Sequence, residues 1–321
     1  MNFDERLDPE LRLMIDRFPA FNLDDISAVR EGFKHVIAGM QNKYSDNISI
    51  EDVYISSDNN SLRIRLYRPR SVENLLPALL WIHGGGYILG TADMSDERQS
   101  EMALRCHCVI VSVDYRLAPE HPYPAALNNC YAALEWLFAS ATKLSIDASR
   151  IAVGGASAGG GLAAAVALLA RDRNEVNPTF QLLIYPMLDD RNTTRSSHDI
   201  TDRRVWNRET NLIGWRAYLG EKIGKEDVSA YAAPARADNL QGLPPAFIAV
   251  GTLDPFLDED IEYARRLSQF GVLTELHVYP GAFHGFDAMA PNSVLSKRAM
   301  RDFDTALLRA FSNESDLLRC S

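Results

Sequence analysis

The sequence predicts an α/β protein built on a largely parallel sheet. From Leu62 onward, short apolar runs alternate with longer helical patterns, the order that βαβ units produce. Several apolar runs are almost continuous in Val, Ile and Leu, as expected for strands that helices cover on both faces. A chain of 321 residues fits one large domain with a modest elaboration.

The order of the elements follows from the same alternation. The apolar runs predict strands at residues 61–67, 78–82, 109–113, 150–154, 180–185, 246–251 and 274–279. The helical patterns lie at residues 123–140, 158–173, 258–270 and 294–311. Together they predict a mostly parallel central sheet flanked by helices.

Two stretches do not fit the alternation. Residues 1–45 are helix-prone and charged, and residues 189–227 carry Trp206, Trp215 and Tyr218 among many charges. Aromatic residues in such a segment disfavour an exposed loop and favour a helical lid over the carboxyl edge of the sheet. We therefore predict a helical cap from 1–45 and 189–227 on a core formed by 46–188 and 228–321.

Charge and hydropathy limit the partners and the location. A net charge of -10 argues against nucleic acid, because phosphate binding needs clustered Lys and Arg. The N-terminal residues mix charges with apolar positions, unlike a secretory signal. The longest weakly polar run, at 159–170, is too short for a membrane span of roughly 20 residues. We expect a cytoplasmic protein with no stable membrane insertion.

The four cysteines show no metal-ligand spacing. Cys106 and Cys108 lie next to a predicted strand, and Cys130 and Cys320 stand apart from them. In a cytoplasmic protein this arrangement indicates reduced thiols and no metal site.

Ser157 lies in a glycine-rich turn between a predicted strand and a predicted helix. The run GGASAGG at 154–160 follows the strand at 150–154. A serine on such a turn takes a strained backbone conformation and projects its hydroxyl above the sheet. The alternative is a phosphate-binding loop, but the Lys that such a loop needs is absent after the last glycine. The pattern predicts Ser157 as a nucleophile.

A second glycine run, HGGG at 83–86, follows the strand at 78–82. Acyl transfer develops negative charge on an oxygen, which fixed backbone N–H donors stabilise. Gly84 and Gly85 are expected to supply two donors, and Ala158 at the helix start a third. His83 is either a base or an anchor that holds the glycines through its ring. We favour the anchor, because a better-placed base exists.

That base is His284, in the segment GAFHGF beyond the strand at 274–279. Loops at the carboxyl ends of strands carry function in α/β folds. Its acidic partner should lie between nucleophile and histidine in the chain, after another strand. Asp254 satisfies both conditions, although an Asp before Pro255 is also suited to cap a helix. Asp258 is the chief competitor.

With these residues in place, the chain resembles the hormone-sensitive-lipase family of esterases, the microbial group called family IV. The likeness covers residues 60–312 and rests on separated motifs in order. They are HGGG at 83–86, YRLAPE at 115–120, SAGG at 157–160, YP at 185–186, DP at 254–255 with DE at 258–259, and HGF at 284–286.

The resemblance implies an α/β-hydrolase fold with a cap, no cofactor, and a homodimer as a common assembly. It makes Tyr87, Tyr185, Phe283 and Phe286 candidates for the pocket wall, although each is equally suited to the core. It also implies a small-molecule ester as substrate, with a short acyl group from acetyl to about hexanoyl.

The expected function is a serine carboxylesterase that forms an acyl-enzyme on Ser157. Two alternatives use the same fold. An amidase, deacetylase or acyltransferase would share the Ser-His-Asp triad, and a non-catalytic ligand receptor would lack the base. The presence of His284 argues against the receptor.

Overall fold

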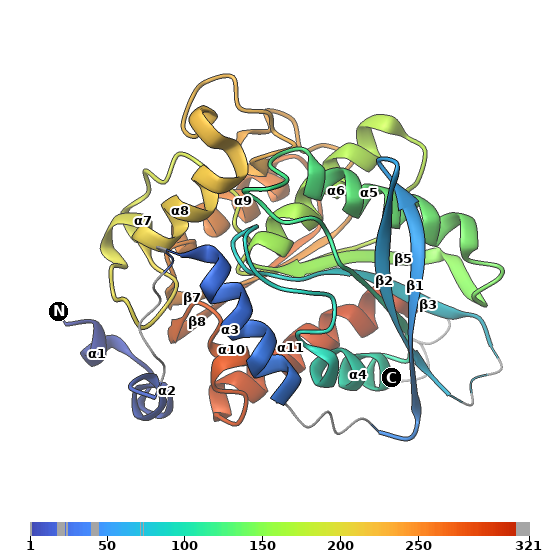
Figure 1. Ribbon diagram of the computed structural model, residues 1–321, viewed down its shortest axis with the longest axis horizontal. Coiled ribbons are helices and arrows are strands. Elements are labelled where there is room, and N and C mark those ends of the chain that lie inside the picture. Colours follow the sequence, from blue (N-terminus) through green and yellow to red (C-terminus); the bar gives the residue numbers. More distant parts are fainter. Residues whose placement is uncertain are drawn as a thin grey trace.

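An eight-stranded sheet forms the centre of the protein (Figure 1), with strand order β1-β2-β4-β3-β5-β6-β7-β8. The computed structural model describes residues 2–17, 23, 25–39, 45–70, 72 and 74–312. The strands β3 to β8 run parallel, whereas β2 is antiparallel to both of its neighbours. The strands are β1 (Ile48–Ser57), β2 (Asn60–Pro69), β3 (Leu76–Ile82), β4 (Val109–Val113), β5 (Ile146–Ala156), β6 (Gln181–Ile184), β7 (Ala246–Leu253) and β8 (Thr274–Phe283).

Helices cover both faces of this sheet. On one face lie α5 (Ala125–Ser140), α6 (Ala158–Arg173) and α9 (Leu257–Gln269), and on the other lie α4 (Asp96–Arg105) and α11 (Val294–Phe311) (Figure 1). Successive side chains of β3 point to opposite faces of the sheet, and both faces are apolar. Leu80 and Ile82 are buried in the core on one face, and Trp81 is buried in the core on the other. The predicted fold class, a mostly parallel sheet flanked by helices, is confirmed.

Two elements of the core were not predicted. The edge strand β1 pairs antiparallel with β2 through a tight turn at Asp58 and Asn59, both with positive φ. Its run ISIEDVYISS carries acidic residues that weaken the apolar pattern. Helix α4 buries polar side chains, Asp96, Gln99 and Ser100 among them, so it lacks the apolar stripe that marks the other helices.

The two stretches outside the alternation contribute no strand in the part of the chain described. Residues 2–39 hold α1 (Phe3–Arg6), α2 (Pro9–Ile15) and α3 (Ile26–Gly39), and residues 189–227 hold α7 (Arg195–Asp199), α8 (Arg208–Leu219) and the 3-10 turn Gly220–Lys222. Arg204 joins them, with ion pairs to Asp4 and, at 2.6 Å, to Asp16. Parts of the predicted cap segment, at 18–22, 24 and 40–44, lie outside the described residues.

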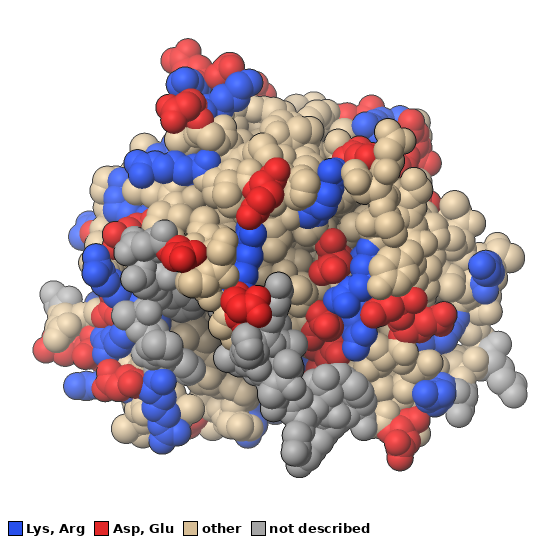
Figure 2. All heavy atoms as spheres, in the orientation of Figure 1, with Lys and Arg blue, Asp and Glu red and all other residues tan. Residues whose placement is uncertain are grey.

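The remaining elements are short, and the surface is mixed in charge. The 3-10 turn Pro234–Arg236 precedes β7, and α10 (Phe286–Met289) precedes α11. On the face drawn in Figure 2, acidic and basic side chains are interspersed over the described residues. This face therefore lacks the clustered basic surface that phosphate binding requires. Among the helices described, none has the length and apolar composition needed to cross a membrane.

Candidate active site

Ser157 occupies a strained turn between β5 and α6. Its φ of 58° and ψ of -125° fall outside the regions that L-residues favour, which typically costs about 1–3 kcal/mol. Its N–H donates to the Ile184 carbonyl at 2.9 Å. A side chain on Gly155 would collide with the Gly159 backbone, and one on Gly159 would collide with the Ile82 carbonyl. The flanking glycines thus permit the turn, as the sequence predicted.

Three side chains from three strand ends form one hydrogen-bonded chain. His284, the residue after β8, places Nε2 at 2.9 Å from the Ser157 hydroxyl oxygen. Its Nδ1 lies 2.7 Å from Asp254 Oδ2, in the loop after β7. Because an ionised carboxylate only accepts, Nδ1 donates, and Nε2 is left to accept a proton from the serine. All three side chains are buried.

Asp254 bonds both to His284 and to its own turn, but it is not the N-cap of α9, which is Phe256. While Oδ2 faces His284, Oδ1 accepts a hydrogen bond from the Phe256 N–H at 2.9 Å, just before α9 begins. This second bond fixes the carboxylate against its own turn. The competing residue, Asp258, accepts instead from the Ser196 N–H at 2.8 Å in α7.

The HGGG run lies directly beside Ser157. A Cβ on Gly84 would lie 2.9 Å from the Ala156 carbonyl oxygen and 3.2 Å from the Ser157 Cβ. Gly85 has a φ of 115°, which favours glycine. Ala158 is the first residue of α6, so its N–H has no acceptor within the helix. The three predicted donors, Gly84, Gly85 and Ala158, are therefore grouped near the serine.

His83 is bonded to its own loop. The Nδ1 lies 2.8 Å from the Gly84 carbonyl oxygen and therefore donates to it. The ring stacks on Tyr115 at 4.2 Å between centroids, and the Tyr115 hydroxyl donates to the His83 carbonyl at 3.0 Å. Burial lowers the pKa of the imidazole. These contacts tie the His83 ring and carbonyl to the loop and to Tyr115.

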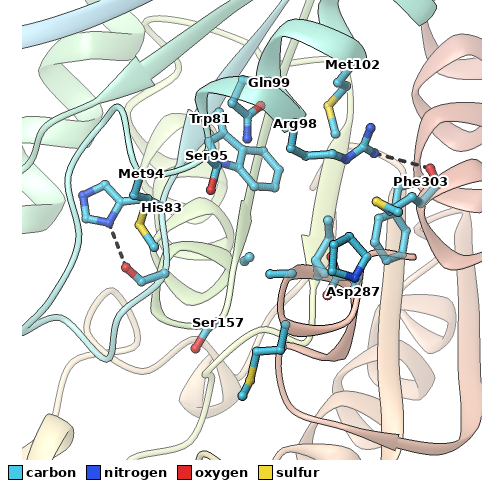
Figure 3. A pocket seen from close by; sticks show the side chains of 18 of the residues that line it. Trp81, His83, Met94, Ser95, Arg98, Gln99, Met102, Ser157, Asp287 and Phe303 are labelled. Carbon is cyan, nitrogen blue, oxygen red and sulfur yellow. Dashed lines mark hydrogen bonds between the residues drawn. The ribbon is translucent and has the colours of Figure 1, made fainter. Parts of the chain in front are cut away.

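A cavity of about 980 Å³ opens from Ser157 and His284 toward α4, α10 and α11 (Figure 3). Tyr185 lines it. The other three aromatic residues expected on its wall, Tyr87, Phe283 and Phe286, are not among its lining residues. Tyr87 stacks on Tyr218 at 4.0 Å, and the two phenylalanines are buried in the core between the sheet and α11.

Comparisons with known proteins agree with this geometry. A family model for the alpha/beta hydrolase fold matches residues 79–288. The chain belongs to the α/β-hydrolase family. The esterase LipI of Mycobacterium tuberculosis is 35% identical over 87% of this chain and 88% of its own length, and the carboxylesterase NlhH of the same organism is 36% identical over the same shares.

A bacterial heroin esterase is similar in structure, with a TM-score of 0.93, 42% identity, and coverage of 97% of this chain and 100% of that one. The predicted hormone-sensitive-lipase-like group and enzyme class, carboxylic ester hydrolase, are confirmed. In this hydrolase, no group of three or more His, Cys, Asp or Glu residues among those described is arranged to hold a metal ion.

Aromatic rings surround the imidazole of this hydrolase, and sequence analysis had not placed two of them there. Tyr185 and Phe256 meet His284 edge to face, at 4.7 and 5.0 Å between centroids. Trp206 of the inserted segment lies at 6.3 Å. A side chain on Gly86 would collide with the Trp206 ring, so this indole touches both the glycine run and the cavity. In the sequence, Trp206 was distinguished only as a bulky aromatic residue in a charged segment.

Tyr185 is held from the far side by Asp287. The Tyr185 hydroxyl donates to Asp287 Oδ1 at 2.7 Å, and both residues line the cavity of the hydrolase. Tyr185 has a φ of 36°, which an unconstrained tyrosine rarely adopts. Sequence analysis did not identify Asp287, although it stands three residues after His284.

Proposed function

We propose that the protein hydrolyses short-chain carboxylic esters through an acyl-enzyme on Ser157. The observation that carries the proposal is the buried chain of hydrogen bonds from Asp254 through His284 to Ser157, at 2.7 and 2.9 Å. A serine hydroxyl is a weak nucleophile unless a base takes its proton, and a positioned carboxylate holds that base in the correct tautomer.

In the first half of the reaction, the Ser157 oxygen attacks the ester carbonyl carbon while its proton passes to His284 Nε2. The tetrahedral intermediate carries negative charge on the former carbonyl oxygen. The N–H groups of Gly84, Gly85 and Ala158 are the donors that we assign to this oxyanion. The imidazolium then gives its proton to the alkoxide as the C–O bond breaks, and the alcohol leaves.

In the second half, water attacks the acyl carbon and gives a proton to His284. The second tetrahedral intermediate collapses, and the proton returns to the Ser157 oxygen as the carboxylic acid leaves. Asp254 is not protonated during the reaction. It orients the His284 ring and stabilises the imidazolium. His83 holds the glycine run and takes no proton.

Residues 1–45 and 189–227 form the cap in this proposal. Trp206 brings the inserted segment to the glycine run, and Arg204 ties that segment to α1 and the end of α2. From α3, Arg30 donates to the backbone carbonyls of Ile88 and Ala118 beyond the glycine run. These contacts support closure of the cavity by the cap.

The deciding experiment is Ser157→Ala, assayed with p-nitrophenyl acetate. We expect kcat to fall by about 10⁶-fold with no loss of folding. A fluorophosphonate should label the wild type once and this variant not at all. The matched control is Ser112→Ala, which changes a buried serine in β4 that does not line the cavity. Near-normal turnover by Ser157→Ala would refute the assignment.

The acyl preference and the reaction class need separate assays. With p-nitrophenyl esters of increasing length, we expect maximal kcat/KM between acetyl and about hexanoyl. Activity confined to long-chain triglycerides contradicts that expectation. Matched amide and ester substrates, with and without an acceptor alcohol, distinguish hydrolysis of esters from amidase and acyltransferase activity on the same triad.

A further inference from the structure

Ser95 and Gln99 are two uncharged polar residues that α4 and its N-cap contribute to the cavity wall. Ser95, at the N-cap position, and Gln99 are four residues apart, and Met102 follows three residues later, so the three share one face of the helix. All three line the cavity that begins at Ser157. Figure 3 shows them along the wall opposite α10 and α11.

The amide of Gln99 has no hydrogen-bond partner among the residues that the structure describes. The residue is 1% exposed, and both Nε2 and Oε1 are buried and unbonded. In Figure 3 the side chain extends from α4 toward the Trp81 ring. Buried polar groups in native proteins are almost always bonded, and an unbonded amide is destabilising. This amide is therefore suited to a partner that enters through the cavity.

Ser95 adds a second group with hydrogen-bonding capacity. A serine at an N-cap normally accepts a bond from the first turn of its helix, but the Ser95 side chain makes no such bond to α4. Its hydroxyl can both donate and accept, as can the amide of Gln99. The pair matches a ligand group that also carries a donor and an acceptor.

The two charged side chains on either side of Gln99 and Ser95 in α4 form ion pairs. Arg98 pairs with Asp304 of α11 at 2.6 Å, and Asp96 pairs with Arg65 at 2.7 Å. Trp81, Met102 and Phe303 add apolar surface to the cavity, and charged residues, Glu97, Lys297 and Arg301 among them, also line it. Because Arg98 and Asp96 beside Gln99 already have counter-ions, a neutral polar group is favoured over a charged one at Ser95 and Gln99.

We propose that Ser95 and Gln99 form a subsite for a neutral group with both donor and acceptor, such as a carboxamide, on the substrate. The group lies at the end of the ester remote from the scissile bond, with an apolar spacer against Trp81 and Met102. This inference rests on the proposed ester hydrolysis, because it places the reacting carbonyl at Ser157.

The test compares ester pairs that differ only at the remote end, a carboxamide in one and the similarly shaped isopropyl group in the other. One series carries the group on the acyl chain of p-nitrophenyl esters, and a second carries it on the alcohol of acetate esters. For the wild type we expect kcat/KM about tenfold higher for the carboxamide in one series. Equal rates within both series would overturn the proposal.

The variant Gln99→Met keeps an unbranched side chain of similar size and removes the amide. We expect it to lower the carboxamide-to-isopropyl ratio about tenfold. The control is Gln181→Met, which changes a buried glutamine of β6 whose Nε2 donates to the Pro244 carbonyl outside the cavity. This control should keep the wild-type ratio. A ratio that Gln99→Met leaves unchanged also overturns the proposal.

Thermal unfolding gives a readout that does not depend on catalysis. Removal of an amide with both Nε2 and Oε1 buried and unbonded should raise Tm by about 2 °C in Gln99→Met. Hexanamide should raise the Tm of the wild type and not of Gln99→Met. An unchanged wild-type Tm with hexanamide counts against the subsite, whereas absence of p-nitrophenyl acetate hydrolysis refutes the proposed function alone.

Discussion

The residues that would perform the chemistry and the residues that shape the cavity are held in different ways. Ser157, Asp254 and His284 follow β5, β7 and β8, so the sheet alone brings them to one edge. Trp206 and Gln99 belong to an inserted segment and to a helix, which are positioned by side-chain contacts. The arrangement of the proposed triad is thus a property of the sheet, whereas the shape of the cavity depends on packing around it.

The largest effect on kcat is expected at Asp254, one of the three residues that the sheet positions. Asp254→Asn should lower kcat by about 10⁴-fold, because an amide facing Nδ1 stabilises the tautomer whose Nε2 is already protonated. The control is Asp258→Asn, whose carboxylate bonds to α7 and not to the imidazole. Steady-state kinetics on p-nitrophenyl acetate decide between them. A larger loss in the control would assign the acid role to Asp258.

A smaller effect is expected where the inserted segment meets the site. Trp206→Ala should change kcat/KM by about tenfold and alter the ranking of acyl chains, since the indole lies beside His284 and lines the cavity. Trp136→Ala, in α5 and away from the cavity, is the control. An acyl-chain profile identical to that of the wild type would show that the inserted segment does not shape selectivity.

Sequence analysis predicted the elements of the sheet and the residues that follow its strands better than the residues that side-chain contacts position. The strand β4 and the helix α11 have the predicted bounds. The side chains of Ser157, His284 and Asp254 lie next to one another because each follows a strand of the same sheet. The acidic strand β1 and the polar helix α4 escaped detection. No sequence pattern indicated that Phe256 would lie against the imidazole of His284.

The candidate pocket residues show that a position close to His284 in the sequence does not place a side chain on the cavity wall. Phe283 and Phe286 flank His284 closely in the chain, yet both are buried in the core. Phe283 is the last residue of β8, and neighbouring side chains along a strand point to opposite faces, so Phe283 faces away from His284. Phe286 begins α10 and packs in the same core. Tyr185, a candidate from the YP motif of the family that the sequence resembles, does line the cavity.

A third prediction tests stability beneath the catalytic loops. Asp260 of α9 is fully buried, and neither carboxylate oxygen has a hydrogen-bond partner in the described part of the chain. Burial, reinforced by Glu259 and then Asp254, raises the pKa of this carboxyl. The folded state therefore binds the proton more tightly than the unfolded chain does. Stability falls as pH rises from the ordinary carboxyl range toward the raised pKa.

Asp260→Asn should remove this dependence. Below about pH 4 the variant and the wild type should have similar free energies of unfolding, because the carboxyl is protonated in both states. At pH 8 the variant should be more stable by about 1–3 kcal/mol in urea unfolding. A gain that does not grow with pH would show that the carboxyl is not the cause.

The smallest expected effect lies between the two cap segments. Arg204→Ala removes the ion pairs to Asp4 and Asp16 and should destabilise the protein by about 1 kcal/mol or less, because such pairs are partly exposed. Hydrogen exchange in α1 and α2 should accelerate more than exchange in the sheet. Arg203→Ala, which loses only an exposed pair to Glu209, is the control.

The strand order also has a consequence for biosynthesis. The strand β3 lies between β4 and β5, and both follow it in the chain, so β3 has no partner until β4 has emerged and lacks its second partner until β5 has emerged. All seven residues of β3 are buried in the folded protein. A nascent chain must therefore carry this strand unpaired through the synthesis of α4, and with one edge unpaired through the synthesis of α5. We expect late insertion of β3 to limit the folding rate and to be the stage most exposed to aggregation and most dependent on chaperones.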